Sequence, residues 1–114
     1  MTASAFSLSV AIPSEGFAVT AGEPVIGALH GESRHYYCPH CLSWVFTRPA
    51  GLDWFVNLRT TLLDEPDLFP PFIETFTTEK LAWVQIPAAH SYPAFPPPEA
   101  YEGLMREYAA QASA

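Results

Sequence analysis

Two cysteines, Cys38 and Cys41, are the residues of this chain whose type and spacing most strongly suggest chemistry. They are the only cysteines in the 114 residues, and they lie in the stretch HYYCPHCLSW as a C-x-x-C pair around Pro39. Thiols at this spacing bind a metal ion, exchange electrons or close a small disulfide. A redox pair is expected at a helix N-terminus, whereas aromatic and β-branched residues flank this one. The spacing therefore favours a metal, and it leaves inert or disulfide-linked cysteines open.

The two thiols supply half of the roughly four ligands that a tetrahedral zinc needs. The other candidate ligands are the histidines His30, His35, His40 and His90. His40 lies inside the C-x-x-C turn and would point away from a metal held by its neighbours. His35 precedes Cys38 by three residues, which puts it on the opposite face of a strand. No combination of these residues predicts a local four-ligand site.

Other catalytic patterns are weak. The chain has no glycine-rich phosphate loop and no G-x-S-x-G motif. Asp64, Glu65 and Asp67 could form an acid–base group, but their proline-rich surroundings favour a solvated loop. The three tryptophans, Trp44, Trp54 and Trp83, are expected in the core or in a cavity wall rather than in a ligand cage.

Composition limits the size and the partners of the protein. A chain of 114 residues with 49% hydrophobic residues suits one domain with a real core. Five basic and 12 acidic residues give a net charge of −7, which disfavours nucleic acid and anionic membranes as partners. No apolar run is long enough for a membrane helix, and the first residues lack a signal-peptide pattern. We therefore expect the cytoplasm, where a C-x-x-C pair is reduced or metal-bound.

The elements that position the cysteines are expected to be strands. Twelve prolines and six glycines divide the chain into short runs, as is typical of strands and turns. An alternation of apolar with small residues predicts a half-buried strand that starts near residue 5 and faces the core with Phe6, Leu8, Val10 and Ile12. β-rich runs predict further strands at residues 17–20, 23–30, 34–38, 43–48, 53–62, 71–76 and 81–87.

A helix is predicted only at the C-terminal end. Apolar residues recur there at i, i+3, i+4 and i+7, at Tyr101, Leu104, Met105 and Tyr108. Pro98 suits the first turn of such a helix. The sequence therefore predicts a mainly-β chain with one amphipathic C-terminal helix.

Three stretches occur in an order that resembles a known family. They are SAFSLSVAIPSEGFAVTAGEP, RHYYCPHCLSWVFTRP and TTLLDEPDLFPPFIETFTTEKLAWVQI, within roughly residues 2 to 98. They resemble the GFA family, proteins similar to the glutathione-dependent formaldehyde-activating enzyme and to centromere protein V. The family turn reads aromatic–Cys–Pro–x–Cys–Gly–Ser, and it is matched by Tyr37, Cys38, Pro39, Cys41 and Ser43, with Leu42 in place of the usual Gly. The LDEP loop at Leu63 to Pro66 and the later Trp83 also match.

The resemblance implies a fold, an activity and a cofactor. The fold is Mss4-like, a β-tent of small antiparallel sheets, expected here as a single domain over residues 1–114. The activity is that of a carbon–sulfur lyase, similar to S-(hydroxymethyl)glutathione synthase, with zinc as cofactor and glutathione as co-substrate. In the family a Cys-x-Cys joins the Cys-Pro-x-Cys turn around a structural zinc, and other cysteines hold a catalytic zinc. By this resemblance Cys38 and Cys41 are half of a structural zinc site.

The start of the chain bears on that activity. The family sequence after its last catalytic cysteine resembles R-x-T-G-S-A-F, and this chain begins MTASAF. We therefore expect an N-terminally incomplete member that lacks the catalytic zinc ligands and is inactive as it stands, with a small thiol or aldehyde as the family's substrate.

Two alternatives remain open. The chain could be a non-catalytic β-tent binding module, zinc-free or sharing one zinc between two chains of a homodimer. An open sheet edge would favour such self-association. A zinc-ribbon-like interaction module is disfavoured by the acidic charge and the missing second cysteine pair.

Overall fold

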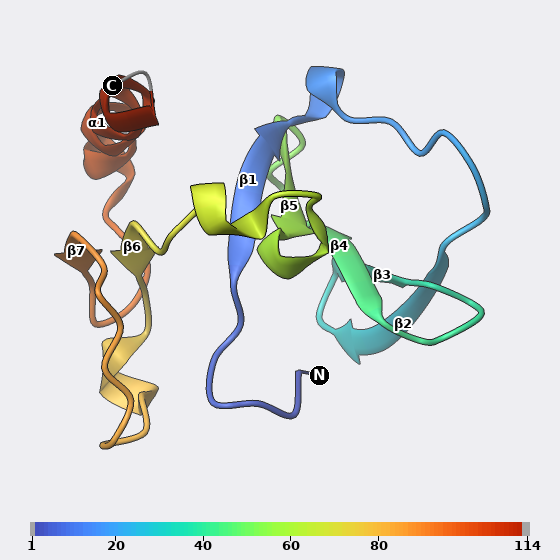
Figure 1. The fold of residues 1–114 in the computed structure, drawn as a ribbon, viewed down its shortest axis with the longest axis horizontal. Helices are drawn as coiled ribbons and strands as arrows, with labels where there is room; N and C mark the ends of the chain where they lie inside the picture. Colours follow the sequence, from blue (N-terminus) through green and yellow to red (C-terminus); the bar gives the residue numbers. More distant parts are fainter. Residues whose placement is uncertain (1, 113–114) are drawn as a thin grey trace. The chain divides into compact units, whose positions relative to one another are not determined.

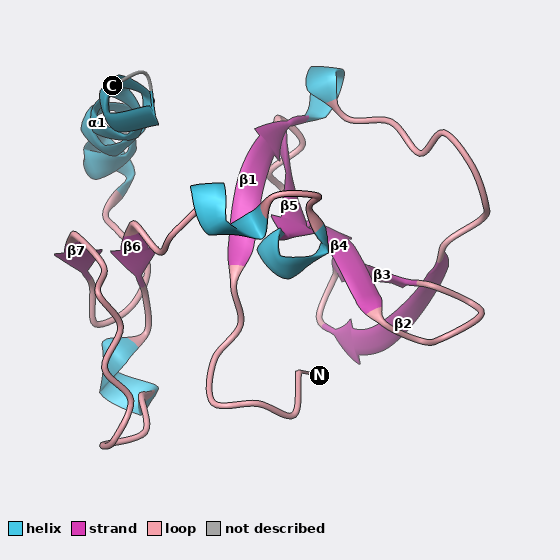
Figure 2. Cartoon of the chain, in the orientation of Figure 1, coloured by secondary structure: helices cyan, strands magenta, loops and turns pink. Residues whose placement is uncertain are grey.

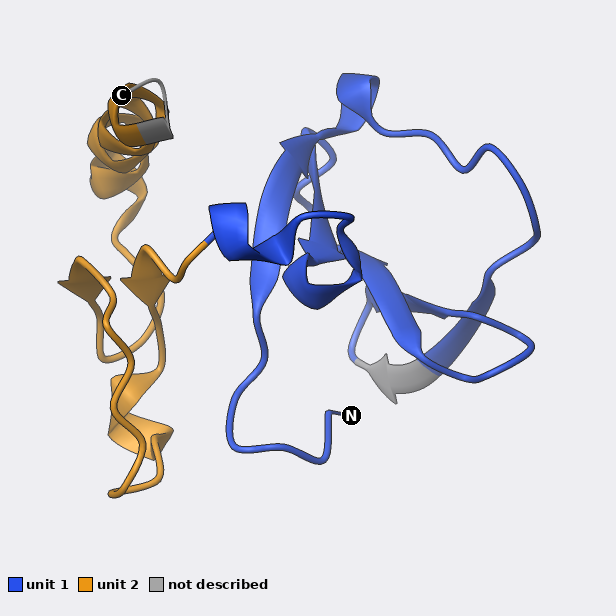
Figure 3. Cartoon of the chain, viewed as in Figure 1, with its two compact units in different colours: residues 1–69 blue, residues 70–114 orange. Residues whose placement is uncertain are grey.

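The computed structural model describes residues 2–112, except the side chains of residues 28–30 and 112. It forms two compact units, Met1–Phe69 and Pro70–Ala114 (Figure 3). The chain is mainly β, with a five-stranded antiparallel sheet, a two-stranded sheet and a C-terminal helix, which confirms the predicted class. The single domain expected over the whole chain stays a prediction.

The first unit is built on the five-stranded sheet, with the order β1-β5-β4-β3-β2 (Figures 1 and 2). Its strands are β1 (Ser9–Pro13), β2 (Val25–His30), β3 (Ser33–Tyr37), β4 (Trp44–Arg48) and β5 (Phe55–Arg59). Short 3-10 helices are η1 (Ser14–Gly16), η2 (Thr60–Leu62) and η3 (Pro66–Leu68). Strands β2 to β5 form a meander in which each pairs with the next, and β1 pairs with β5 at the far edge. The four strands of the meander lie where the sequence predicted them.

The first strand is shorter than predicted. Val10 and Ile12 are half-buried between exposed neighbours, as the alternation requires, and Leu8 just before the strand is also half-buried. Phe6, however, is 51% exposed, so its predicted place on the core face is wrong. The reason is the partner strand: β1 pairs only with β5, and β5 ends at Arg59, opposite the first residue of β1.

The core of the first unit centres on Phe46 and Val56, which are almost inaccessible. The Phe46 ring stacks on Tyr36 at a centroid distance of 4.5 Å and lies 4.9 Å from the ring of Phe17. Phe17 begins the run predicted as a strand at residues 17–20, and that prediction is wrong because the run is a loop. Phe17 packs against Phe46 in the core, while Val19 is 45% exposed.

The second unit contains β6 (Ile73–Glu74), η4 (Thr77–Glu79), β7 (His90–Ser91), η5 (Pro98–Ala100) and α1 (Tyr101–Ala112). Strands β6 and β7 pair parallel, unlike the antiparallel sheets that the resemblance implied. The strand predicted at residues 81–87 is wrong, because the Val84 N–H donates to the Leu81 carbonyl at 3.0 Å and closes a turn. The C-terminal helix is confirmed, with Leu104 buried, but Met105 is 55% exposed and outside its apolar face.

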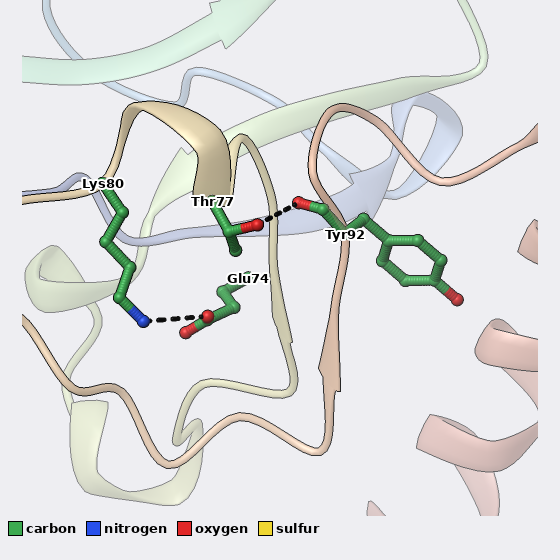
Figure 4. Close-up of polar contacts among 4 residues, drawn as sticks. All are labelled: Glu74, Thr77, Lys80 and Tyr92. Carbon is green, nitrogen blue, oxygen red and sulfur yellow. Dashed lines mark hydrogen bonds and ion pairs between the residues drawn. The ribbon is translucent and has the colours of Figure 1, made fainter.

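Polar contacts stabilise the second unit around β6 and β7 (Figure 4). The Lys80 ammonium donates to a Glu74 carboxylate oxygen at 3.2 Å, and the Thr77 hydroxyl donates to the Tyr92 carbonyl, also at 3.2 Å. Within residues 2–112, no helix has the length and apolar character needed to cross a membrane.

Candidate thiol site and adjoining pockets

Cys38 and Cys41 lie on the turn that joins β3 to β4. The Cys38 N–H donates to the Ser43 carbonyl at 2.9 Å, and the Leu42 N–H donates to the Cys38 carbonyl at 2.8 Å. Both cysteines are free thiols, Cys38 half-buried and Cys41 exposed. The predicted surface turn between two strands is therefore confirmed, and neither thiol lies on a helix.

The two thiols are close enough to influence one another. The Cys41 sulfur lies 3.2 Å from the Ser43 hydroxyl oxygen. That hydroxyl, then the Ser43 backbone and then the Cys38 thiol lower the pKa of Cys41 by hydrogen bonding. A lowered pKa enlarges the thiolate fraction, and the thiolate is the form that attacks electrophiles or binds metals. Of the two cysteines, Cys41 combines a lowered pKa with exposure to solvent.

Within the first unit, His40 belongs to this turn and His35 to the neighbouring strand β3. His35 is a buried residue of β3, and its Nδ1 lies 2.7 Å from the hydroxyl of Thr47, its partner on β4. His40 is exposed. In the second unit, His90 Nε2 lies 2.8 Å from a Glu107 carboxylate oxygen. The side chain of His30, the fourth candidate ligand, lies outside the described residues.

The donor set does not complete a zinc shell. No group of three or more His, Cys, Asp or Glu side chains that could hold a metal occurs in the part of the chain that the structure describes. Cys38 and Cys41 offer two soft sulfur ligands, and structural zinc takes about four. Because one chain's described residues supply half of the shell, we derive no step through a metal. The assignment of the two cysteines to a structural zinc site stays a prediction.

Leu42 explains the family preference for glycine at its position. Its φ is 61°, in the left-handed region, and its side chain is 69% exposed. A Cβ atom makes this backbone conformation costly, whereas glycine adopts it freely. The turn therefore carries backbone strain that the leucine side chain does not offset by packing.

Replacing Leu42 by glycine is expected to raise the free energy of unfolding by about 1 kcal/mol, because relief of the left-handed strain exceeds the extra unfolded-state entropy of glycine. Chemical denaturation of the two proteins would measure the change. Leu42→Ala, which keeps the Cβ atom, is the control and should leave stability near that of the original chain. A loss of stability in Leu42→Gly would show that the turn is not strained.

A polar network between β3 and β4 connects Trp44 with His35. The Trp44 indole N–H donates to the Thr47 hydroxyl at 2.9 Å, and the same oxygen contacts His35 Nδ1. The His35 and Trp44 rings meet edge to face at a centroid distance of 5.5 Å. Trp44 directly follows Ser43, so this network fixes the ring that stands next to the thiol turn.

Arg59, at the end of β5, also contacts the Trp44 ring. Its guanidinium carbon lies 4.3 Å from the centroid of the Trp44 ring, a cation–π contact. Its Nη1 is enclosed and has no hydrogen-bond partner among the described residues, and burial lowers the pKa of Arg59. Arg59 was not among the site residues predicted from the sequence. The scarcity of basic residues, five in an acidic chain, was the signal that could have found it.

Two pockets adjoin the thiol turn. The first, of about 350 Å³, is lined by Tyr37, Leu42, Ser43, Trp44, Arg59, Thr61 and Leu62, together with Thr2 and Ser4. The second, of about 340 Å³, is mostly apolar and includes residues 17–24, Cys38, Pro39, Val45, Phe46 and Leu58. Leu58 and Arg59 are neighbours in one strand, so their side chains lie on opposite faces of the sheet. The turn thus has a polar pocket with a cation on one side and an apolar pocket on the other.

The remaining candidates are not among the residues that line these pockets. Asp64, Glu65 and Asp67 are exposed, which confirms the predicted solvated loop. Trp44 is part of a cavity wall as predicted, whereas Trp54 and Trp83 are 52% and 73% exposed, so their predicted burial is wrong.

Comparison with known proteins agrees with the resemblance. The family model described as glutathione-dependent formaldehyde-activating enzyme matches residues 1–79. This range includes the whole five-stranded sheet, the thiol turn and both pockets. No curated protein matches the chain. Because the match covers more than half of its residues, the chain belongs to the GFA family.

Proposed function

We propose that this protein takes part in thiol–aldehyde adduct chemistry of the carbon–sulfur lyase type, on the pattern of glutathione-dependent formaldehyde activation. Membership of the GFA family supports the class of reaction, with glutathione and formaldehyde as the small-molecule substrates that the family name implies. The observation that carries the proposal to this chain is the pair of facing thiols on the β3–β4 turn, beside a pocket large enough for a small ligand.

In this proposal Cys38 and Cys41 contribute half of a structural zinc site, and residues 1–114 alone do not accelerate the reaction. Zinc catalysis needs about three protein ligands and an open position. The 114 residues contain two cysteines, both already placed in the structural half-site. We further propose that the protein has no nucleic-acid partner, because its net charge of −7 repels polyanions. We also propose a cytoplasmic location, where a C-x-x-C pair is reduced or metal-bound.

Zinc content and turnover, measured together, test this proposal. We expect the protein of residues 1–114, purified as a monomer, to hold well below one tightly bound zinc per chain, because affinity depends on the number of deprotonated ligands. Elemental analysis gives the zinc content, and the rate of glutathione–formaldehyde adduct formation should equal the rate without protein. The matched control is the double substitution Cys38→Ser, Cys41→Ser. Stoichiometric zinc in the monomer, or clear turnover, would contradict the proposal.

A second candidate is a non-catalytic module in which two chains share one zinc. The exposure of Cys41 on a surface turn favours it, since the turn is accessible to a second copy. Four thiolates from two chains would complete a tetrahedral shell. This candidate requires a dimer that forms on addition of zinc, contains about half a zinc per chain and dissociates in the double serine variant.

A further inference from the structure

The guanidinium of Arg59 is a positive charge that the described protein does not neutralise. No ion pair or hydrogen bond to it occurs among the described side chains, whereas Lys80 and Arg106 both have carboxylate partners. The group is not fully hydrated either, since Nη1 is enclosed. A partly buried charge without a counter-charge is costly, and binding an anion is one way to offset that cost.

The guanidinium is also held in a defined orientation. Its contact with the Trp44 ring, at 4.3 Å from the ring centroid, limits the positions that the fork can take. Trp44 is itself tethered through its indole N–H to the buried Thr47. A planar guanidinium held in place suits a carboxylate, because two parallel N–H groups match its two oxygens.

The pocket that Arg59 lines adds hydroxyl groups and reaches the thiol turn. Ser43 and Thr61 contribute hydroxyls to its wall, and Ser43 is the residue whose hydroxyl lies 3.2 Å from the Cys41 sulfur. Its volume of about 350 Å³ falls in the range of small-molecule sites. A ligand in this pocket would therefore extend between a fixed cation and the C-x-x-C turn.

We propose that this pocket is a carboxylate-binding site and that Arg59 binds a carboxylate of the thiol substrate. The identity of the substrate rests on the proposed function; for a glutathione-dependent family it is glutathione, a peptide with a free carboxylate at each end. Ser43 and Thr61 supply hydrogen bonds to the peptide, and the thiol turn borders the pocket. Arg59 thus selects small thiols that carry a carboxylate over neutral ones.

Calorimetric titration of the full chain with three probes tests the recognition directly. Glutathione and S-methylglutathione are expected to bind with similar affinity, because the contact with Arg59 does not involve the thiol. Glutathione diethyl ester, which lacks free carboxylates, is expected to bind about 10- to 100-fold more weakly, as is typical of losing a hydrogen bond to a charged group. Raising the salt concentration should weaken the binding of glutathione and leave the ester unaffected. Equal affinity for glutathione and its ester would overturn the proposal.

Substitutions assign the effect to Arg59. Arg59→Gln is expected to lower the affinity for glutathione to that for the ester. Arg59→Lys keeps the charge and loses the planar fork, so its affinity for glutathione should lie between those of the original chain and of Arg59→Gln. Arg48→Gln is the matched control: it removes the same charge from the same sheet, at an exposed position over Phe17 and outside the pocket. Equal losses of affinity for glutathione in Arg48→Gln and Arg59→Gln would show a general effect of charge and refute the site. If Arg59→Gln does not fold, the difference in affinity between glutathione and its diethyl ester on the original chain still tests whether the pocket binds a carboxylate.

These measurements are independent of the test of the proposed function. Discrimination between glutathione and its ester by a monomer that holds stoichiometric zinc, or that shows clear turnover, would uphold the pocket and contradict the proposed function. Little zinc in the monomer and no turnover, without discrimination between glutathione and its ester, would do the reverse.

Discussion

Replacing Phe46 by alanine is expected to lower the free energy of unfolding by about 3–5 kcal/mol, the usual cost of removing a buried phenylalanine ring. The side chain is 2% exposed. Its ring stacks on Tyr36, contacts Phe17 and carries the Arg48 guanidinium at 5.6 Å. The first unit has few other fully buried apolar residues among those described, Val56 above all, so it has little material to refill the cavity.

Amide hydrogen exchange in β4 and β5, together with chemical denaturation, would measure this loss. Leu52→Ala is the matched control in the same unit, because Leu52 is 45% exposed and its truncation should change stability by about 0.5 kcal/mol or less. If Phe46→Ala does not fold, Phe46→Leu should fold with a smaller loss. Similar small losses for Phe46→Ala and Leu52→Ala would show that the core is not centred on Phe46.

Replacing Thr47 by valine is expected to cost about 2–4 kcal/mol, because one methyl group would take the place of a hydroxyl that serves two partners. The Trp44 indole N–H and His35 Nδ1 both lose this contact, and an unsatisfied buried polar group costs about 1–3 kcal/mol. Valine has nearly the shape of threonine, so packing is preserved. The Trp44 ring, which supports Arg59, also loses its tether.

Thr47→Ser is the control, since it keeps the hydroxyl and loses only a methyl group. Denaturation midpoints and the NMR resonance of the Trp44 indole N–H would separate the two variants. The serine protein should keep the chemical shift that this N–H has in the original chain, because the hydrogen bond remains, and the valine protein should not. A valine variant as stable as the serine variant would mean that the network contributes nothing to stability.

The meander and the thiol turn were predictable because their signals are local. The runs around Tyr36 and Phe46 are rich in aromatic and β-branched residues and are separated by a tight turn, so each strand finds its partner in the next segment. Pro39 and the C-x-x-C spacing mark the turn itself. In such hairpins the partner is specified by proximity along the chain.

The wrong strands had the composition of strands but no partner. Residues 17–20 and 81–87 contain Phe17, Val19, Trp83 and Val84, yet β propensity reflects packing against a neighbouring strand rather than an intrinsic preference. Phe17 and Val84 contribute single side chains to the cores of their units from loops. Nothing in the residues themselves distinguishes such a loop from a strand.

The pocket could not be predicted because it depends on contacts across the sheet. Arg59 and Trp44 are brought together by the pairing of β4 with β5, in which Phe46 lies opposite Leu58. A β-bulge in β4, between the partners of Tyr36 and Tyr37, also alters which residues share a face. Without the register and the bulge, an arginine at the end of a strand looks like any exposed cation.

The strand order of the first unit sets a sequence of events for its folding. Strands β2 to β5 pair with their neighbours along the chain, so each step closes a short loop at a small entropic cost. Strand β1 differs: Ile12 pairs with Val56, and the whole meander separates them in the sequence. The loop entropy of that contact is large until the meander has formed and small afterwards. Chain topology therefore places the docking of β1 last, onto the free edge of β5 and after the thiol turn between β3 and β4 has formed.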